Sequence, residues 1–278
     1  MQDDPCLSLL LLTEDGAQNA CLTIEALVHK MLHLVDGKYR KNRIDFQPQN
    51  DRSREAMQGN IWKSSKREDR PKLVDLGRSI ATKLLERDEE PGFVLFHFDG
   101  DCAWSKRKRE CQNINKFEAF VVRFVEQVVV DTLHSEHEKA VQLAAAAAGP
   151  TKKKASRRPD ITAAKAKAMS RLIRLTPFYS IEAWLFQNTV EARRLCQKSR
   201  CGRHLEKIAG WESARGTLDE LPKIKDELPC LEDRHNHQLA ATSFPHHEAE
   251  SAGKSYAETV ARLRECPDLP AALARTWA

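Results

Sequence analysis

Two acidic side chains one residue apart, Asp99 and Asp101, directly follow the mostly apolar run of residues 93–98. A short apolar run bounded by turn residues is typical of a buried strand. Carboxylate oxygens are the ligands that Mg²⁺ prefers, and one or two of them commonly hold the ion while substrate phosphates complete its shell. The pattern therefore predicts a strand that carries a divalent-metal site at its carboxyl end.

A second apolar run, residues 7–12, leads into Thr13, Glu14 and Asp15. If the two strands are parallel neighbours, Glu14 lies beside Asp99 and Asp101, where it could bind the metal or act as a general acid or base. Gly100 would let the backbone turn and a phosphate approach closely. The same acids could instead cap the helices that follow or form a turn, and spacing alone leaves both interpretations open.

A third predicted strand, residues 171–177, precedes a capped helix start at residues 180–186, which brings Glu182 to the same edge. An acidic side chain in a first helical turn is also favoured by the helix dipole alone. A basic run follows the paired acids and could bind phosphate or nucleic acid, although charge runs are usually solvated faces. It consists of Lys106, Arg107, Lys108 and Arg109.

The elements expected around these acids alternate between strand and helix. Residues 43–46 form a further short strand, and apolar residues at helical spacing predict helices at residues 17–34, 73–85, 117–128 and 256–264. Residues 47–71, which include Trp62, are predicted to be a long surface loop. This order indicates an α/β fold with a mainly parallel sheet flanked by helices, in which ligands bind outside the carboxyl ends of the strands.

The 278 residues, 41% of them hydrophobic, are interpreted as one domain over residues 1–278. An Ala- and Lys-rich stretch at residues 143–168 is predicted to be a flexible insertion, either a tolerated surface loop or a basic arm that binds nucleic acid. Residues 187–278 are predicted to be a helical or irregular extension packed on the same domain.

The longest apolar stretch near the start is six residues, far short of the ~20 that span a bilayer. We therefore expect no membrane segment, a cytoplasmic location, and reduced thiols rather than disulfides for the eight cysteines. Cys196, Cys201 and His204 have spacing that zinc permits, but a set could be completed only if Cys230, His235 or His237 came close in the fold. The sequence favours ordinary buried or surface cysteines.

Three short motifs taken together resemble the Toprim-type proteins of bacterial genomes related to the OLD-family nucleases. They are Leu-Leu-Thr-Glu-Asp-Gly at residues 11–16, Phe-Asp-Gly-Asp at 98–101 and Tyr-Ser-Ile-Glu-Ala-Trp-Leu at 179–185. The resemblance implies a Toprim-like, Rossmann-like domain in which Glu14, Asp99 and Asp101 bind Mg²⁺ or Mn²⁺. Glu182 belongs to the third motif and is a candidate further ligand. The family's glutamate is usually followed directly by glycine, so here either Glu14 or Asp15 could face the metal.

By this resemblance the chain is expected to be a metal-dependent nuclease that hydrolyses DNA or RNA, as the effector of a bacterial anti-phage defence or toxin-like system. The sequence has no Gly-x-x-x-x-Gly-Lys-Ser/Thr loop, so an ATPase partner would be a separate chain. Two alternatives stay open. One is a haloacid-dehalogenase-like phosphatase, and the other is a non-catalytic module that binds metal or nucleic acid.

Overall fold

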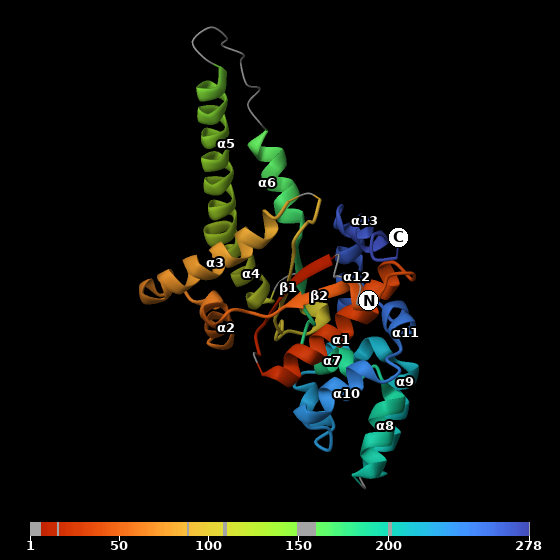
Figure 1. Cartoon of the computed structure of the whole chain (residues 1–278). Coiled ribbons are helices and arrows are strands. Elements are labelled where there is room, and N and C mark those ends of the chain that lie inside the picture. The colour runs from red at the N-terminus through yellow and green to blue at the C-terminus, as the bar shows by residue number, and fades with distance from the viewer. Residues whose placement is uncertain are drawn as a thin grey trace.

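The computed structural model contains a four-stranded sheet at its centre (Figure 1). It describes residues 7–15, 17–87, 89–107, 110–148, 160–199 and 202–277. The sheet has the order β2-β1-β3-β4, and every neighbouring pair is parallel. Its strands are β1 (Leu7–Thr13), β2 (Ile44–Gln47), β3 (Phe93–His97) and β4 (Leu172–Leu175). The predicted α/β class, the parallel sheet and the four strand positions are therefore confirmed.

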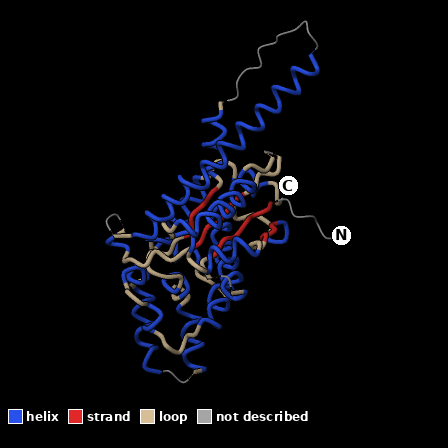
Figure 2. The backbone as a smooth tube through the Cα atoms, turned by 90° about the vertical axis from the view of Figure 1, so that its left-hand side faces the viewer, coloured by secondary structure: helices blue, strands red, loops and turns tan. Residues whose placement is uncertain are grey.

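Helices cover both faces of the sheet, as Figures 1 and 2 show. One core cluster joins the sheet to α2 (Asp51–Gln58), α3 (Arg70–Leu84), α4 (Gln112–Phe120), the π-helix η5 (Val121–Glu126), α5 (Gln127–Ala148) and α6 (Ile161–Ser170). The other joins it to α1 (Gln18–Val35), α7 (Glu182–Leu185), α8 (Thr189–Lys198), α9 (Leu205–Ser213), α10 (Asn236–Ala241), α11 (His246–Ser251), α12 (Lys254–Glu265) and α13 (Leu269–Ala274).

The two middle strands explain this arrangement. Along β1, Leu9 and Leu11 belong to one cluster while Leu10 and Leu12 belong to the other, because successive side chains of a strand point to opposite faces. Both faces are buried, which is why the strand reads as a continuous apolar run. The helices that follow β1 and precede β3 lie on opposite faces, so the chain reverses its winding between these strands. Ligands of doubly wound sheets bind at such a switch point.

The surface loop predicted over residues 47–71 is wrong. Helix α2 occupies part of it, and its N-terminus is capped by Asn50, whose side chain accepts a hydrogen bond of 2.8 Å from the Ser53 N–H. Trp62 is 1% exposed and packs with ring centroids 5.4 Å from Phe96 and 4.8 Å from Phe98. The segment reads as a loop because a short, mostly polar helix gives a weak periodic signal.

The flexible insertion predicted at residues 143–168 is helical at both described ends. Helix α5 runs through the alanine residues to Ala148, as the high helix propensity of alanine favours, and α6 begins at Ile161 with Asp160 as its cap. Residues 149–159 lie outside the described residues, so the basic part of the insertion cannot be placed. Together α5 and α6 extend away from the rest of the molecule (Figure 1).

Residues 187–278, predicted to be partly irregular, contain helices α8 to α13. The predicted closing helix at residues 256–264 is α12, and α13 follows it. Helices α10 and α12 both contact α1. No described helix of the protein has the length and apolar character needed to cross a membrane.

The contact between α3 and η5 depends on a glycine. An added Cβ at Gly77 would lie 2.5 Å from the carbonyl oxygen of Phe124, which is a backbone atom that cannot rotate away. By contrast, Gly210 in the interior of α9 has nothing within 4 Å of the same position. Both glycines are therefore helical, but only Gly77 is closely packed against a neighbouring backbone.

We expect Gly77→Ala to lower the free energy of unfolding by about 1–3 kcal/mol because of overpacking. The matched variant Gly210→Ala should raise it by about 0.5–1 kcal/mol, because alanine favours a helix interior. Urea unfolding followed by circular dichroism measures both. If the two variants changed stability in the same direction, the close approach of α3 and η5 would be contradicted.

His29 in α1 is buried against Tyr39, whose hydroxyl donates a 2.8 Å hydrogen bond to the His29 carbonyl oxygen. Phe46 packs edge-on against the imidazole at a centroid distance of 5.1 Å. Burial, with smaller contributions from Lys41 and Lys30, lowers the pKa of His29 to about 4. The imidazole is therefore neutral in the folded protein at pH 7.

An unfolded histidine has a pKa of about 6.5, so between that pH and about pH 4 the unfolded chain binds a proton that folded His29 does not. The free energy of unfolding should thus fall as the pH falls through this window, by up to about 3 kcal/mol. Urea unfolding at a series of pH values measures the slope. His29→Asn should show a shallower slope, and an unchanged slope would exclude His29 as its source.

Candidate functional site

A cavity of about 700 Å³ opens at the carboxyl ends of β1 and β3. The register pairs Thr13 with His97, and the Glu14 N–H continues the ladder with a 3.2 Å hydrogen bond to the His97 carbonyl oxygen. The two strands therefore end level with each other. The acids Glu14, Asp15, Asp99 and Glu182 line the cavity, and residues 223–236 add Lys223, Lys225, Asp226, Asp233 and Asn236 to its lining.

Glu14 rather than Asp15 is turned towards Asp99. Its Oε2 accepts a 3.3 Å hydrogen bond from the Asp99 N–H, and its Oε1 forms an ion pair of 2.7 Å with the Nζ of Lys63. Asp15 is exposed, and its Oδ1 accepts a 2.9 Å hydrogen bond from the Ala17 N–H. Asp15 thus orders the start of α1, while Glu14 contacts the loop that follows β3.

Asp99 is the most electrostatically strained group of the site. Its side chain is 32% exposed as a whole, yet its Oδ1 is buried, and no group within the described residues donates a hydrogen bond to that atom. Burial raises the pKa of Asp99 well above its usual range, and the nearby carboxylates of Glu182, Glu14 and Asp101 raise it further. The Ile181 N–H opposes this shift with a hydrogen bond.

His97 lies beneath Asp99, with its Nε2 3.9 Å from the Asp99 Oδ1. Burial lowers the pKa of His97 to about 3, so the imidazole is neutral and this contact is not an ion pair at pH 7. Neither ring nitrogen has a hydrogen-bond partner among the residues that the structure describes. His97 therefore contributes no positive charge beside Asp99 at pH 7.

Asp101 points to a different partner from Asp99. The Nδ2 of Asn113 donates hydrogen bonds of 2.9 Å to the Asp101 Oδ2 and 2.8 Å to the Asp99 carbonyl oxygen, so it orders the whole loop. Asp101 has φ +55°, a left-handed conformation that aspartate tolerates. It is not among the described residues that line the cavity.

Gly100 serves a different purpose from the one predicted. A Cβ at this position would lie 2.5 Å from the Phe178 carbonyl oxygen, so the space that was expected to admit a phosphate is filled by backbone. The Gly100 N–H donates to the Pro177 oxygen at 3.0 Å, and the Asp101 N–H donates to the Tyr179 oxygen at 3.0 Å. The glycine thus permits the acidic loop to pack against the segment after β4.

Glu182 reaches the site from α7, and only 7% of it is exposed. The Nδ2 of Asn236 donates a 3.5 Å hydrogen bond to its Oε1. The predicted side-chain cap is wrong, because α7 is a single turn whose N-cap is Ile181 and no side chain caps it. The helix therefore gains its position from packing, with Trp184 buried and its Nε1 donating to the Ser255 hydroxyl at 2.7 Å.

The basic run predicted to bind phosphate does not line this cavity where it is described. Lys106 pairs with Glu110 at 3.4 Å, and Arg107 lies 4.2 Å from the ring centroid of Trp104. Lys108 and Arg109 lie outside the described residues. The cations found near the acids are Lys63, Lys223 and Lys225. Lys63 is part of a basic cluster in the sequence, but no sequence signal places residues 223–225 here.

The acids are the right kind of ligand for a hard cation, but few of their ligand atoms lie close together. Mg²⁺ or Mn²⁺ would bind carboxylate oxygens, including the buried Oδ1 of Asp99, which has no hydrogen-bond donor among the described residues. Mg²⁺ needs only one or two protein carboxylates. Among the described residues, however, ligand atoms of three groups lie mutually within 4.8 Å only at Cys196, His204 and Cys230. The carboxylates at β1 and β3 therefore fit a metal held by few protein ligands, with Asp99 as its anchor.

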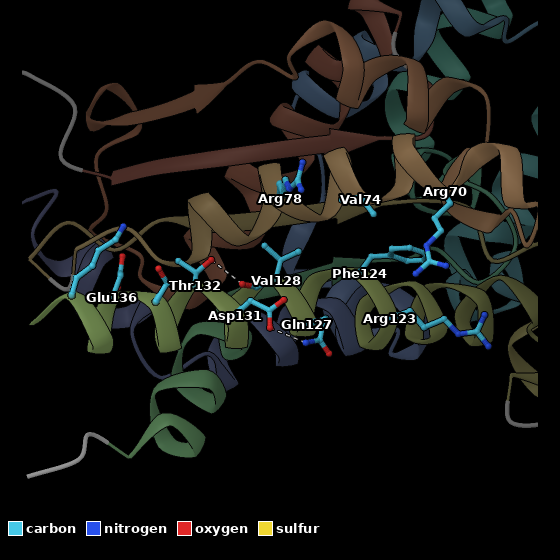
Figure 3. Close-up of a pocket in the computed structure, with 12 residues that line it drawn as sticks. Arg70, Val74, Arg78, Arg123, Phe124, Gln127, Val128, Asp131, Thr132 and Glu136 are labelled. Carbon is cyan, nitrogen blue, oxygen red and sulfur yellow. Dashed lines mark hydrogen bonds between the residues drawn. The ribbon is translucent and has the colours of Figure 1, made fainter. Parts of the chain in front are cut away.

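A second cavity, of about 540 Å³, lies between α3 and the continuous helix of η5 and α5 (Figure 3). Arg70 and Arg78 come from one side, and Arg123 and Asp131 from the other. Its lining mixes cations, acids and apolar side chains, and it contains none of the residues predicted to be functional. We assign it no role in the chemistry.

The chain was compared with family models, curated proteins and solved structures. No family model, curated protein or solved structure matches this chain. The Toprim resemblance therefore rests on the three sequence motifs and on the position of their acids in the fold.

Asp99 lies close to other acidic side chains. A variant with a neutral side chain of the same shape at this position should therefore be more stable than the wild type when no metal is added. We expect Asp99→Asn to raise the free energy of unfolding in EDTA at pH 7 by on the order of 1 kcal/mol. Urea unfolding measures the change. The control Asp45→Asn, at an exposed position in β2, should stay within about 0.5 kcal/mol of the wild type. A destabilised Asp99→Asn would show that the hydrogen bond from the Ile181 N–H outweighs burial and the repulsion from the neighbouring acids.

Proposed function

We propose that the chain is a divalent-metal-dependent nuclease of Toprim-like fold that hydrolyses phosphodiester bonds in DNA or RNA. The observation that carries the proposal is the Asp99 carboxylate at the switch point of a doubly wound sheet, whose buried Oδ1 has no hydrogen-bond donor among the described residues and which has Glu14 and Glu182 beside it. A protein that buries an acid next to other acids loses stability, and a functional role for such a group is the common reason for this cost.

The residues that would hold Mg²⁺ or Mn²⁺ are Asp99 and Glu182, both of which line the cavity. The bound ion would polarise a phosphoryl oxygen and lower the pKa of a coordinated water. Before substrate binds, Lys63 neutralises Glu14 through the 2.7 Å ion pair. A substrate phosphate that engages Lys63 would release Glu14 to accept a proton from the attacking water.

Two cations from residues 223–236 line the cavity together with Asp226 and Asp233. Lys223 and Lys225 are exposed and line the cavity, and Lys225 is ion-paired with Asp233. These cations would bind phosphates flanking the scissile bond. In a cell we propose that the nuclease acts as the effector of an anti-phage or toxin-like system, with an ATPase on a separate chain.

One observation favours the non-catalytic alternative. Glu14 and Asp101 already have polar partners, Lys63 and Asn113, so two of the predicted metal ligands are occupied within the protein itself. A module that retained the fold to bind nucleic acid would keep such contacts permanently. The phosphatase alternative requires an Asp nucleophile open to a small monoester, and Asp99 lines the cavity in a position that does not exclude it.

Cleavage of duplex DNA, single-stranded DNA and structured RNA by the purified protein separates these functions. With Mg²⁺ or Mn²⁺ we expect cutting of at least one substrate that EDTA abolishes and that Asp99→Asn lowers by at least about 10²-fold, the typical scale for an essential polar group. Asp45→Asn should cut as the wild type does.

A parallel reaction with p-nitrophenyl phosphate tests the phosphatase alternative, because only a phosphomonoesterase should release p-nitrophenol rapidly from it. Thermal unfolding with and without Mn²⁺ tests metal binding apart from turnover, since a bound ion raises the melting temperature. Metal binding and nucleic-acid binding without any cleavage would support the module. Equal cutting by Asp99→Asn and the wild type would contradict the proposed acidic centre.

A further inference from the structure

Three potential metal ligands from separate segments meet in the C-terminal third of the chain. Cys196 belongs to α8, His204 to the 3₁₀ helix η6 (Gly202–His204), and Cys230 to the turn between η8 (Ile224–Glu227) and η9 (Asp233–His235). Their ligand atoms all lie within 4.8 Å of one another. The cluster shares no residue with the described lining of the acidic cavity.

The geometry within the cluster is close. The Sγ atoms of Cys196 and Cys230 are 2.6 Å apart, and the Nδ1 of His204 is 3.2 Å from the Cys230 Sγ. Cys196 and His204 are buried, and Cys230 is half-buried. Two thiols and an imidazole thus lie within one small volume.

The donor set selects the kind of ion. Thiolate and imidazole are ligands of Zn²⁺, whereas Mg²⁺ and Ca²⁺ take oxygen. A disulfide between the cysteines would join the two sulfur atoms but would not involve the imidazole of His204. A shared metal ion would bind all three groups. With Zn–S bonds of about 2.3 Å, two thiolates on one tetrahedral ion lie roughly 3.8 Å apart. The sulfurs would therefore separate by about 1 Å on binding.

We propose that Cys196, His204 and Cys230 bind a structural Zn²⁺. Structural zinc sites are almost always four-coordinate. The proposal rests on the three groups whose positions the structure gives.

The ion would fasten α8 to the wall of the acidic cavity. Cys230 lies between Lys225 and Asp233 in the chain, and both of these residues line that cavity. Asp233 is also tied to α1, because its carbonyl oxygen accepts a 2.7 Å hydrogen bond from the Nδ2 of Asn19. The segment around Cys230 contains only short 3₁₀ helices, so a bound metal ion would hold it in place against α8. The zinc proposal does not depend on the hydrolytic one.

The test is the metal content of the full chain, purified without chelator or added metal and measured by plasma mass spectrometry. We expect one zinc per chain in the wild type, and a fall to near zero in Cys230→Ser and His204→Ala. Cys21→Ser is the matched control, because Cys21 is also half-buried but lies outside the cluster, and it should keep its zinc.

A second measurement does not depend on whether the variants fold. Wild-type protein is produced in cells grown with Co²⁺ in place of Zn²⁺, and its absorption spectrum is recorded. The spectrum should show the intense visible bands of tetrahedral Co²⁺ and a thiolate-to-metal charge-transfer band. Absence of zinc from the wild type would overturn the proposal. So would zinc retained in both cluster variants, or recovery of Cys196 and Cys230 as a disulfide-linked peptide pair from the purified protein.

Discussion

The parallel pairing of β1 with β3 is the constraint on which the site depends. The register brings Thr13 opposite His97, so the residues that follow the two strands, Glu14 and Asp99, leave the sheet at the same level. The register is held over the paired positions from Leu9 with Phe93 to Thr13 with His97. The pairing of two apolar strands therefore determines where two carboxylates meet.

The sequence predicts β1 and β3 well because each is an apolar run with clear ends. It predicts the meeting of Glu14 with Asp99 for the same reason, since parallel neighbours end at one edge. It fails for α2 and Trp62, where a short polar helix covers a large aromatic side chain and no periodic pattern reveals it. Local propensity is a weak guide when tertiary packing supplies most of a helix's stability.

The partners of the acids could not be predicted because they come from distant parts of the chain. Lys63 reaches Glu14 from 49 residues away, and Asn236 reaches Glu182 from 54 residues away. The same holds for the thiol cluster, where 34 residues separate Cys196 from Cys230. Spacing along the sequence carries information only about neighbours in one element, so long-range pairs of this kind require the fold.

The contact of Gly100 with the Phe178 backbone has a consequence for ion choice. The N–H groups of Gly100, Asp101 and Cys102 donate to the carbonyl oxygens of Pro177, Tyr179 and Phe178, so hydrogen bonds join the acidic loop to the segment that leads to Glu182. If a metal binds as we propose, these bonds would limit how far Asp99 and Glu182 separate to suit ions of different radius. Mg²⁺ takes short metal–oxygen distances, whereas Ca²⁺ prefers longer bonds and more ligands. Such a pair of carboxylates would thereby favour the smaller ion.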